Sequence, residues 1–229
     1  MIAFRYIKSR RVEGFISISA WFSLLGIMLG VATLIVVMSV MNGFRTELVD
    51  RILGINGHLI IYSKNERTIP NYTKIINKIL DTPNVVAVTA HLEGQALAKN
   101  KNSISGVIIR GSNWSDLAAK KILWKSLNQS TISNFKDKQN IIMGYRLGQK
   151  LNLKVGDFVS LISPNGMETA LGVLPVNQNF KVGGFFDMGM YEYDNNFIFI
   201  PWKKAELFLS TSNIAHGIEV FLKDQKLTS

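Results

Sequence analysis

Residues 14–44 read GFISISAWFSLLGIMLGVATLIVVMSVMNGF and contain no charged side chain. A helix rises about 1.5 Å per residue and the hydrocarbon core of a bilayer is about 30 Å thick, so roughly 20 residues span it. Residues 14–44 are therefore predicted to form a transmembrane helix with some overhang. A cleaved secretion signal is the poorer interpretation, because its core has about 7 to 15 apolar residues and this stretch continues through residues 34–38.

The residues on either side of this stretch predict its orientation. The first 13 residues are expected to form a short basic helix at the inner membrane surface. Cationic flanks stay in the cytoplasm, so the remainder of the chain is predicted to lie outside. The charged residues in this flank are Arg5, Lys8, Arg10 and Arg11, opposed by Glu13.

Two further features concern the helix itself. Gly26 and Gly30 are four residues apart, and small residues at this spacing let membrane helices approach closely. They are predicted to pack on another span, although glycine is also common in membrane helices for other reasons. After residue 44, charged and apolar residues alternate at helical spacing, which predicts an amphipathic stalk over residues 45–57 that stops near Gly54.

Residues 58–229 contain short apolar runs separated by turn residues, which is typical of an α+β fold. No second membrane span is predicted, because each of these runs has only the length of a strand. We expect two mixed subdomains. The predicted strands are 58–63, 85–89, 95–99, 105–110, 155–163, 180–184 and 197–200, and the predicted helices are 71–80, part of 114–126, 145–151 and 202–209.

Composition excludes several classes of function. The chain has no cysteine, so disulfides and cysteine-bound metal are excluded. Its net charge of +10 is spread over the sequence without an arginine-rich run, so nucleic-acid binding is not predicted. There is no phosphate-binding loop pattern, nucleophile elbow or helical HExxH motif. We therefore predict neither enzymatic activity nor a cofactor.

No metal site is predicted either. His58, His91 and His216 are far apart and lie next to apolar segments, so each is interpreted as a hydrogen-bonded histidine. Asp187, Glu192 and Asp194 form an acidic group that is interpreted as a solvated, mobile loop, with cation binding as the weaker alternative.

Several short motifs together resemble one known family. They are SVMNGF at residues 39–44, RILG at 51–54, IRG at 109–111, IIMG at 141–144, LKVGD at 153–157 and FKVGG at 180–184. Across essentially the whole chain, the sequence resembles the amino-terminal part of the LolC/LolE family, the lipoprotein-releasing system permeases with a MacB-like periplasmic domain.

The resemblance implies a bacterial inner-membrane subunit of an ABC transporter with a cytoplasmic amino terminus and a periplasmic main domain. Such a transporter uses ATP hydrolysis by a separate ATPase subunit to release lipoproteins, and a periplasmic chaperone receives them. A second permease subunit, identical or a sister protein, is the other expected partner. The family has four spans and this sequence only the first, so we expect a fragment or a split gene product. Without the resemblance, the alternative is a single-span membrane-anchored periplasmic binding or sensory protein.

The resemblance also suggests a chaperone-binding hook. One subunit type of the family carries a hairpin that holds the chaperone, and residues 164–179 match it. The alternative is an ordinary hairpin that folds back on the core. Pro164 and Pro175 are expected to discourage simple strand continuation, and Lys181 is the one cation nearby. The predicted hook residues are Ala170, Leu171, Gly172, Leu174 and Pro175.

Overall fold

The computed structural model describes residues 14–64, 68–101, 103–169 and 172–223. It contains two compact units, Met1–Asp50 and Arg51–Ser229. The predicted interfacial helix at residues 1–13 lies outside the described residues.

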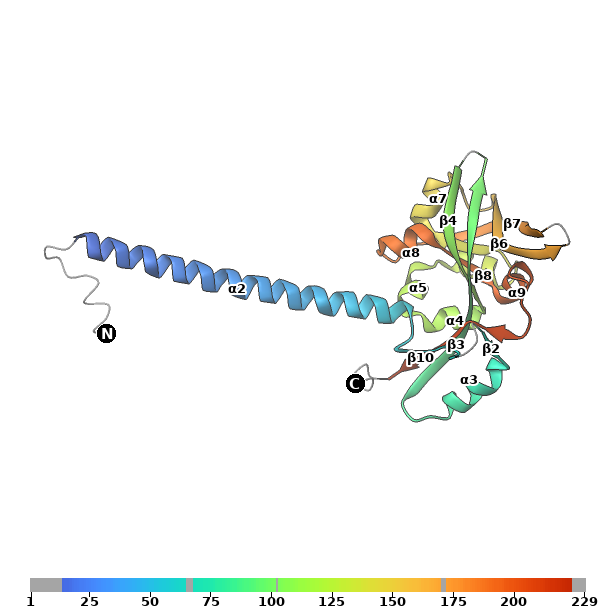
Figure 1. Ribbon diagram of the computed structural model, residues 1–229, viewed down its shortest axis with the longest axis horizontal. Helices are drawn as coiled ribbons and strands as arrows, with labels where there is room; N and C mark the ends of the chain where they lie inside the picture. The colour runs from blue at the N-terminus through green and yellow to red at the C-terminus, as the bar shows by residue number, and fades with distance from the viewer. Residues whose placement is uncertain (1–13, 65–67, 102, 170–171, 224–229) are drawn as a thin grey trace. The chain divides into compact units, whose positions relative to one another are not determined.

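The predicted span and stalk form one continuous helix, α2 (Gly14–Ile55), of 42 residues (Figure 1). Within the described residues it is the one helix long and apolar enough to cross a membrane, with a mean hydropathy of 2.6 in its most apolar window. The helix ends one residue beyond the predicted stop at Gly54, and Asn56 donates its backbone N–H to the carbonyl of Ile52 at 3.0 Å.

In the second unit, strand β3 (Val85–Asn100) belongs to two sheets. Its first half pairs antiparallel with β10 (Gly217–Leu222), which also pairs with β1 (Leu59–Ile61). Its second half pairs antiparallel with β4 (Ser103–Ser112). The strands predicted separately at 85–89 and 95–99 are thus one strand, because the residues between them continue the same ladder. The α+β fold class is confirmed.

The second sheet closes on itself. From β4 the order continues through β8 (Phe197–Pro201), β5 (Ile141–Gly144), β7 (Gly172–Phe186) and β6 (Phe158–Thr169), and β6 pairs with β3. The β4–β8 and β5–β7 pairs are parallel, and the others are antiparallel. Buried apolar side chains from all six strands form one cluster, which includes Ala98, Ile109, Ile141, Leu161, Val182 and Ile198.

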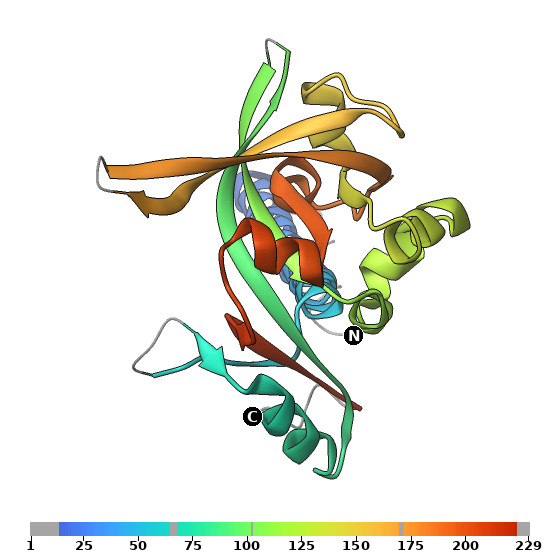
Figure 2. The ribbon, with the colours of Figure 1, turned by 90° about the vertical axis from the view of Figure 1, so that its right-hand side faces the viewer.

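Helices cover both sheets (Figure 2). Helix α3 (Tyr72–Leu80) packs on the first half of β3, and Tyr72 and Ile76 contact a cluster that includes Val88 and Val220. A second apolar cluster contains Ile55 from the end of α2. The remaining helices are α4 (Trp114–Ala119), α5 (Lys121–Ser126), α6 (Gln129–Lys136), α7 (Tyr145–Lys150), α8 (Tyr191–Asn196) and α9 (Trp202–Phe208), and β2 (Ile69–Pro70) pairs with β9 (Ile214–Ala215).

Strands β6 and β7 form a long hairpin that extends from the closed sheet (Figure 2). Both strands continue beyond Pro164 and Pro175, but their ladder is irregular at the prolines, which fits the expectation that the prolines discourage simple strand continuation. The prolines are accommodated where the register shifts between Ser163 and Met167, since a locally irregular ladder does not require their missing N–H groups.

Candidate functional site

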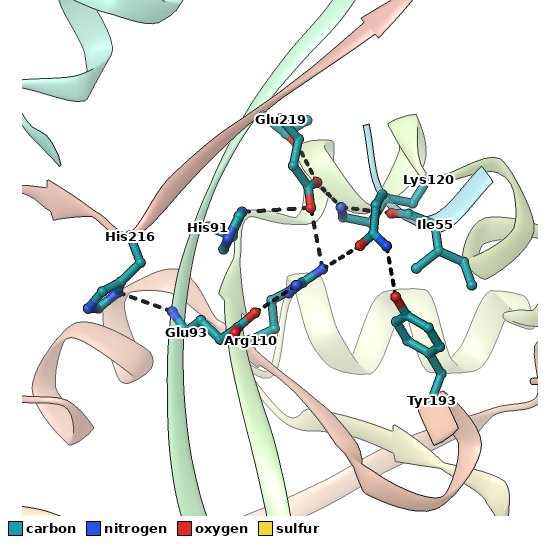
Figure 3. Close-up of polar contacts among 10 residues, drawn as sticks. Ile55, His91, Glu93, Arg110, Lys120, Tyr193, His216 and Glu219 are labelled. Carbon is teal, nitrogen blue, oxygen red and sulfur yellow. Dashed lines mark hydrogen bonds and ion pairs between the residues drawn. The ribbon is translucent and has the colours of Figure 1, made fainter. Parts of the chain in front are cut away.

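Glu219 lies at the centre of a buried group of charged side chains (Figure 3). It is on β10, flanked by Ile218 and Val220, and its exposed fraction is 0%. Its carboxylate pairs with Lys120 through Oε2 and with Arg110 Nη1 through Oε1 at 3.3 Å. Thr89, its cross-strand neighbour on β3, donates its hydroxyl to Oε2 at 3.3 Å. The carboxylate is therefore satisfied by side chains from three separate parts of the chain.

Arg110 extends this group across the neighbouring strands. It is on β4, and its Nη2 contacts Oε2 of Glu93 on β3 at 2.6 Å. Its Nη1 also donates to Oδ1 of Asn56 at 3.1 Å, directly after the end of α2. Its guanidinium lies 5.5 Å from the centre of the Phe197 ring. Arg110 thus joins two carboxylates to the residue that follows the helix.

Lys120 completes the attachment of α2. Its Nζ donates to the carbonyl oxygen of Ile55 at 3.1 Å, and its side chain is 1% exposed. The last carbonyls of a helix have no partner within the helix and carry a partial negative charge, so a cation here is favourable. Asn56 then donates its amide to the hydroxyl of Tyr193 at 2.8 Å. We call Asn56, Glu93, Arg110, Lys120 and Glu219 the charge cluster.

The charge cluster is electrically balanced. Two cations, Arg110 and Lys120, face two carboxylates, Glu93 and Glu219. Burial alone would raise the pKa of Glu219, but Lys120 and Arg110 outweigh it and hold that pKa below its ordinary value. Burial and then Arg110 lower the pKa of His91 to about 4, so His91 is neutral at neutral pH. Buried charges are tolerated when each has a partner, and this arrangement provides one for each.

The backbone after α2 also lies unusually close to the sheet. Gly57 is buried, and a Cβ atom at this position would lie 2.8 Å from the backbone nitrogen of Val220. Only glycine fits this approach without a shift of β10. Together with the buried side chain of Ile55, this contact fixes the chain immediately after the helix against the domain.

The sequence-predicted site residues lie elsewhere. A Cβ atom at Gly26 or Gly30 would meet no atom within 4 Å among the described residues, so the predicted helix packing stays a prediction. Gly172, Leu174 and Pro175 lie on β7 in the β6–β7 hairpin, with Gly172 opposite Thr169 and Leu174 opposite Met167. Ala170 and Leu171 lie outside the described residues. The hook therefore also stays a prediction.

The histidines and the acidic group have structural roles. His58 Nδ1 accepts the backbone N–H of Leu222 and His216 Nδ1 accepts that of Glu93, both at 3.1 Å. The interpretation of residues 187–194 as a solvated loop is wrong for Asp194, which is fully buried in α8. Its carboxylate accepts the backbone N–H groups of Met188 at 2.8 Å and Met190 at 3.1 Å, and thereby closes the turn. Burial raises the pKa of Asp194.

The charge cluster was not predicted from the sequence, although the sequence contains a signal for it. Arg110 and Glu219 each interrupt an apolar run that reads as a buried strand, VIIRG and GIEVF. A charged residue in such a run is rarely buried without a partner. The signal shows that partners exist, but not which distant residues they are.

Comparisons with known proteins assign the chain to a family. The family model of the MacB-like periplasmic core domain matches residues 20–228. The lipoprotein-releasing system transmembrane protein LolC of Neisseria meningitidis serogroup B (strain ATCC BAA-335 / MC58) is 31% identical over 228 residues, which cover 97% of this chain and 54% of LolC. The corresponding protein LolE of Haemophilus influenzae (strain ATCC 51907 / DSM 11121 / KW20 / Rd) is 26% identical over 230 residues, with coverage of 97% and 54%.

Among solved structures, the extracellular domain of the noncanonic ABC-type transporter YknZ from Gram-positive bacteria has a TM-score of 0.49 and 15% identity, and the match covers 72% of this chain and 82% of that one. The chain spans about half the length of the curated relatives it matches. The LolC/LolE resemblance read from the motifs is confirmed, and the chain belongs to the family of MacB-like periplasmic core domains.

Proposed function

We propose that this chain supplies the first membrane span and the outer domain of a permease subunit in an ABC transporter that releases lipoproteins from the inner membrane. The names of the LolC and LolE relatives support this function. A separate ATPase subunit provides the energy, as the relationship to the LolC and LolE transmembrane proteins suggests. A second permease subunit completes the membrane part.

The observation that carries this proposal is the attachment of helix α2 to the sheet. The helix is continuous from Gly14 to Ile55. Its last carbonyl is held by Lys120, and the next residue, Asn56, is held by Arg110. The last turn of the helix, which belongs to the second unit, is therefore bonded through Arg110 and Asn56 to β4 and through Lys120 and Glu219 to β10. Rigid elements joined by hydrogen bonds and ion pairs are the physical means by which distant sites are coupled.

In this proposal the amino terminus is cytoplasmic and the second unit is periplasmic. Basic residues precede the span, and cationic flanks remain in the cytoplasm. The released lipoprotein passes to a periplasmic chaperone, which binds the β6–β7 hairpin around Leu171. Movement of α2 during the ATPase cycle then changes the position of this hairpin through the charge cluster.

The test separates ATP hydrolysis from lipoprotein release. The native permease, purified with its ATPase and placed in proteoliposomes with a lipoprotein, is compared with an Asn56→Ala variant. We expect ATP hydrolysis to continue and release to fall at least fivefold, because Asn56 links the end of α2 to Arg110 and Tyr193. The matched control is Asn77→Ala on the exposed surface of α3.

Equal release by the Asn56→Ala variant and the wild type would contradict the coupling role of the charge cluster. Mass spectrometry of the native preparation tests the assembly itself. We expect an ABC ATPase and further membrane spans to copurify. A chain recovered without either would favour the single-span binding or sensory protein.

A further inference from the structure

A basic pocket lies at the carboxyl ends of the parallel strands β4 and β8, separate from the charge cluster. Ser112 and Pro201, the last residues of these strands, are paired in register and both line the pocket. Its volume is about 650 Å³. Cavities of this size hold small ligands, and the carboxyl ends of parallel strands are a common place for them. The other lining residues include Trp114, Ser115, Lys136, Trp202, Lys203 and Lys204.

The pocket is positively charged. Lys136, Lys203 and Lys204 line it, and none of its lining residues is acidic. Within the described part of the chain, none of these lysines forms an ion pair with a carboxylate. Lys204 donates to the carbonyl oxygen of Gln139 at 2.6 Å, and Lys136 lies 4.7 Å from the centre of the Trp114 ring. Three ammonium groups near one cavity repel one another, so an anion between them is favourable.

A second observation, independent of charge, points to the same ligand class. Ser112 is 1% exposed, and its hydroxyl has no hydrogen-bond partner among the described residues. Buried hydroxyls are nearly always hydrogen-bonded, because an unpaired one loses its interaction with water without replacement. Ser112 lines the pocket, so an oxygen-rich ligand that reaches its hydroxyl would provide that partner.

We infer that this pocket binds a phosphate-bearing ligand. Ammonium, hydroxyl and amide groups are donors, and phosphate oxygens are strong acceptors of charge-assisted hydrogen bonds. Ser112, Ser115 and Lys203 supply such donors, while Trp114 and Trp202 give the cavity apolar walls for the remainder of the ligand. The phosphate comes from a lipid headgroup or from a soluble phosphate compound, and the test distinguishes these two sources. This site is independent of the proposed transport function.

The test uses the four tryptophans of the chain as probes. The full chain is labelled with 5-fluorotryptophan, placed in phosphatidylcholine nanodiscs and observed by fluorine NMR. Inorganic phosphate is one titrant and short-chain phosphatidylglycerol is the other. We expect saturable shifts of the Trp114 and Trp202 signals, while Trp21, in the predicted span, serves as the internal reference. A response to both titrants indicates a soluble phosphate source, and a response to the lipid alone indicates a headgroup.

Two variants and one control make the inference falsifiable. Lys203→Gln and Ser112→Ala should each weaken binding about tenfold, the loss of one charge-assisted or buried hydrogen bond. Lys78→Gln removes the same charge from the exposed surface of α3 and should bind like the wild type. Ser112→Ala has a second readout, because removal of an unpaired buried hydroxyl should leave the unliganded chain at least as stable as the wild type.

Three results would overturn the inference. The first is the absence of a saturable shift with either titrant, and the second is equal binding by all three variants. The third is a response to glutamate equal to the response to phosphate, because the pocket would then bind any anion as a counterion.

Discussion

Lys120 donates from Nζ to the carbonyl oxygen of Ile55 at 3.1 Å, and the same ammonium pairs with Glu219 on β10. One buried side chain thus joins the last turn of the long helix to the sheet. A surface ion pair contributes little to stability, but a buried one is costly to break, because the remaining charge has no water to replace its partner.

Replacement of Glu219 by glutamine should therefore strongly destabilise the domain. The change leaves Lys120 and Arg110 as buried cations without their shared carboxylate. We expect the free energy of unfolding to fall by about 3 to 5 kcal/mol. Urea unfolding of the chain in detergent, followed by near-ultraviolet circular dichroism, measures it. The double variant Lys120→Met/Glu219→Leu should recover much of this loss, because Arg110 keeps Glu93. A loss below about 1 kcal/mol in Glu219→Gln would show that the carboxylate is not needed.

Stability should fall as the pH decreases from 6.5 to 4. The pKa of His91 is lowered from 6.5 to about 4 in the folded chain. In this interval the unfolded chain binds a proton that the folded chain does not, so protonation favours unfolding, by up to about 3 kcal/mol. His91→Gln cannot titrate and should flatten this part of the stability profile. Identical profiles for the variant and the wild type would contradict the assignment.

Gly57→Ala should destabilise the domain by about 1 to 3 kcal/mol, as overpacking does. The new Cβ atom would lie 2.8 Å from the backbone nitrogen of Val220, and a backbone atom in a strand cannot move away independently. The matched control is Gly106→Ala, also in the second unit, where a Cβ atom meets no described atom within 4 Å. Thermal unfolding compares the two. A similar melting temperature for both variants would argue against a tight approach at Gly57.

Gly26→Leu or Gly30→Leu should disrupt assembly and leave the outer domain folded. Both glycines leave open space on α2, into which a neighbouring span can fit, and a leucine would fill that space. Copurification of the partner subunits measures assembly, and circular dichroism measures folding. Val31→Leu is the control, since it keeps a large apolar side chain in the same helix. Unchanged assembly of the complex in either leucine variant would contradict helix packing at that glycine.

Leu171→Asp, in the predicted hook, should weaken capture of the periplasmic chaperone, because an apolar anchor that a partner buries loses this burial when it is charged. Photocrosslinking yield from the hairpin to the chaperone is the measurement. Val155→Asp, at an exposed apolar position outside the hairpin, is the control. A crosslinking yield equal to that of the wild type would contradict the hook function of the β6–β7 hairpin.

The elements that were predicted correctly from the sequence are those with strong local signals. The long apolar run, the stop near Gly54 and the periodicity of α3 all depend on neighbouring residues, and the structure agrees with each. Strand β10 was missed, although GIEVFL is apolar, because the charge at Glu219 obscured its pattern. The length of β3 was underestimated, because Gly94 and the polar residues around it resemble a turn until two different partners are known.

The charge cluster could not be assembled from the sequence for a related reason. Lys120 is 65 residues from Ile55 and 99 residues from Glu219. Contacts at such separations depend on the order of strands in the sheet, and local propensity does not determine that order. The motif at residues 109–111 identified Arg110 only as part of a family pattern, and its three polar partners, Asn56, Glu93 and Glu219, come from three different parts of the chain.

The 16 residues of β3 form a single strand that is a member of both sheets. A slip of one residue in a ladder would turn every side chain to the opposite face. Since one backbone sets the register on both sides, a shift of β3 along its own axis would break its pairing with β10 and its pairing with β4 at the same time. The shared strand should therefore hold its position when the domain is pulled.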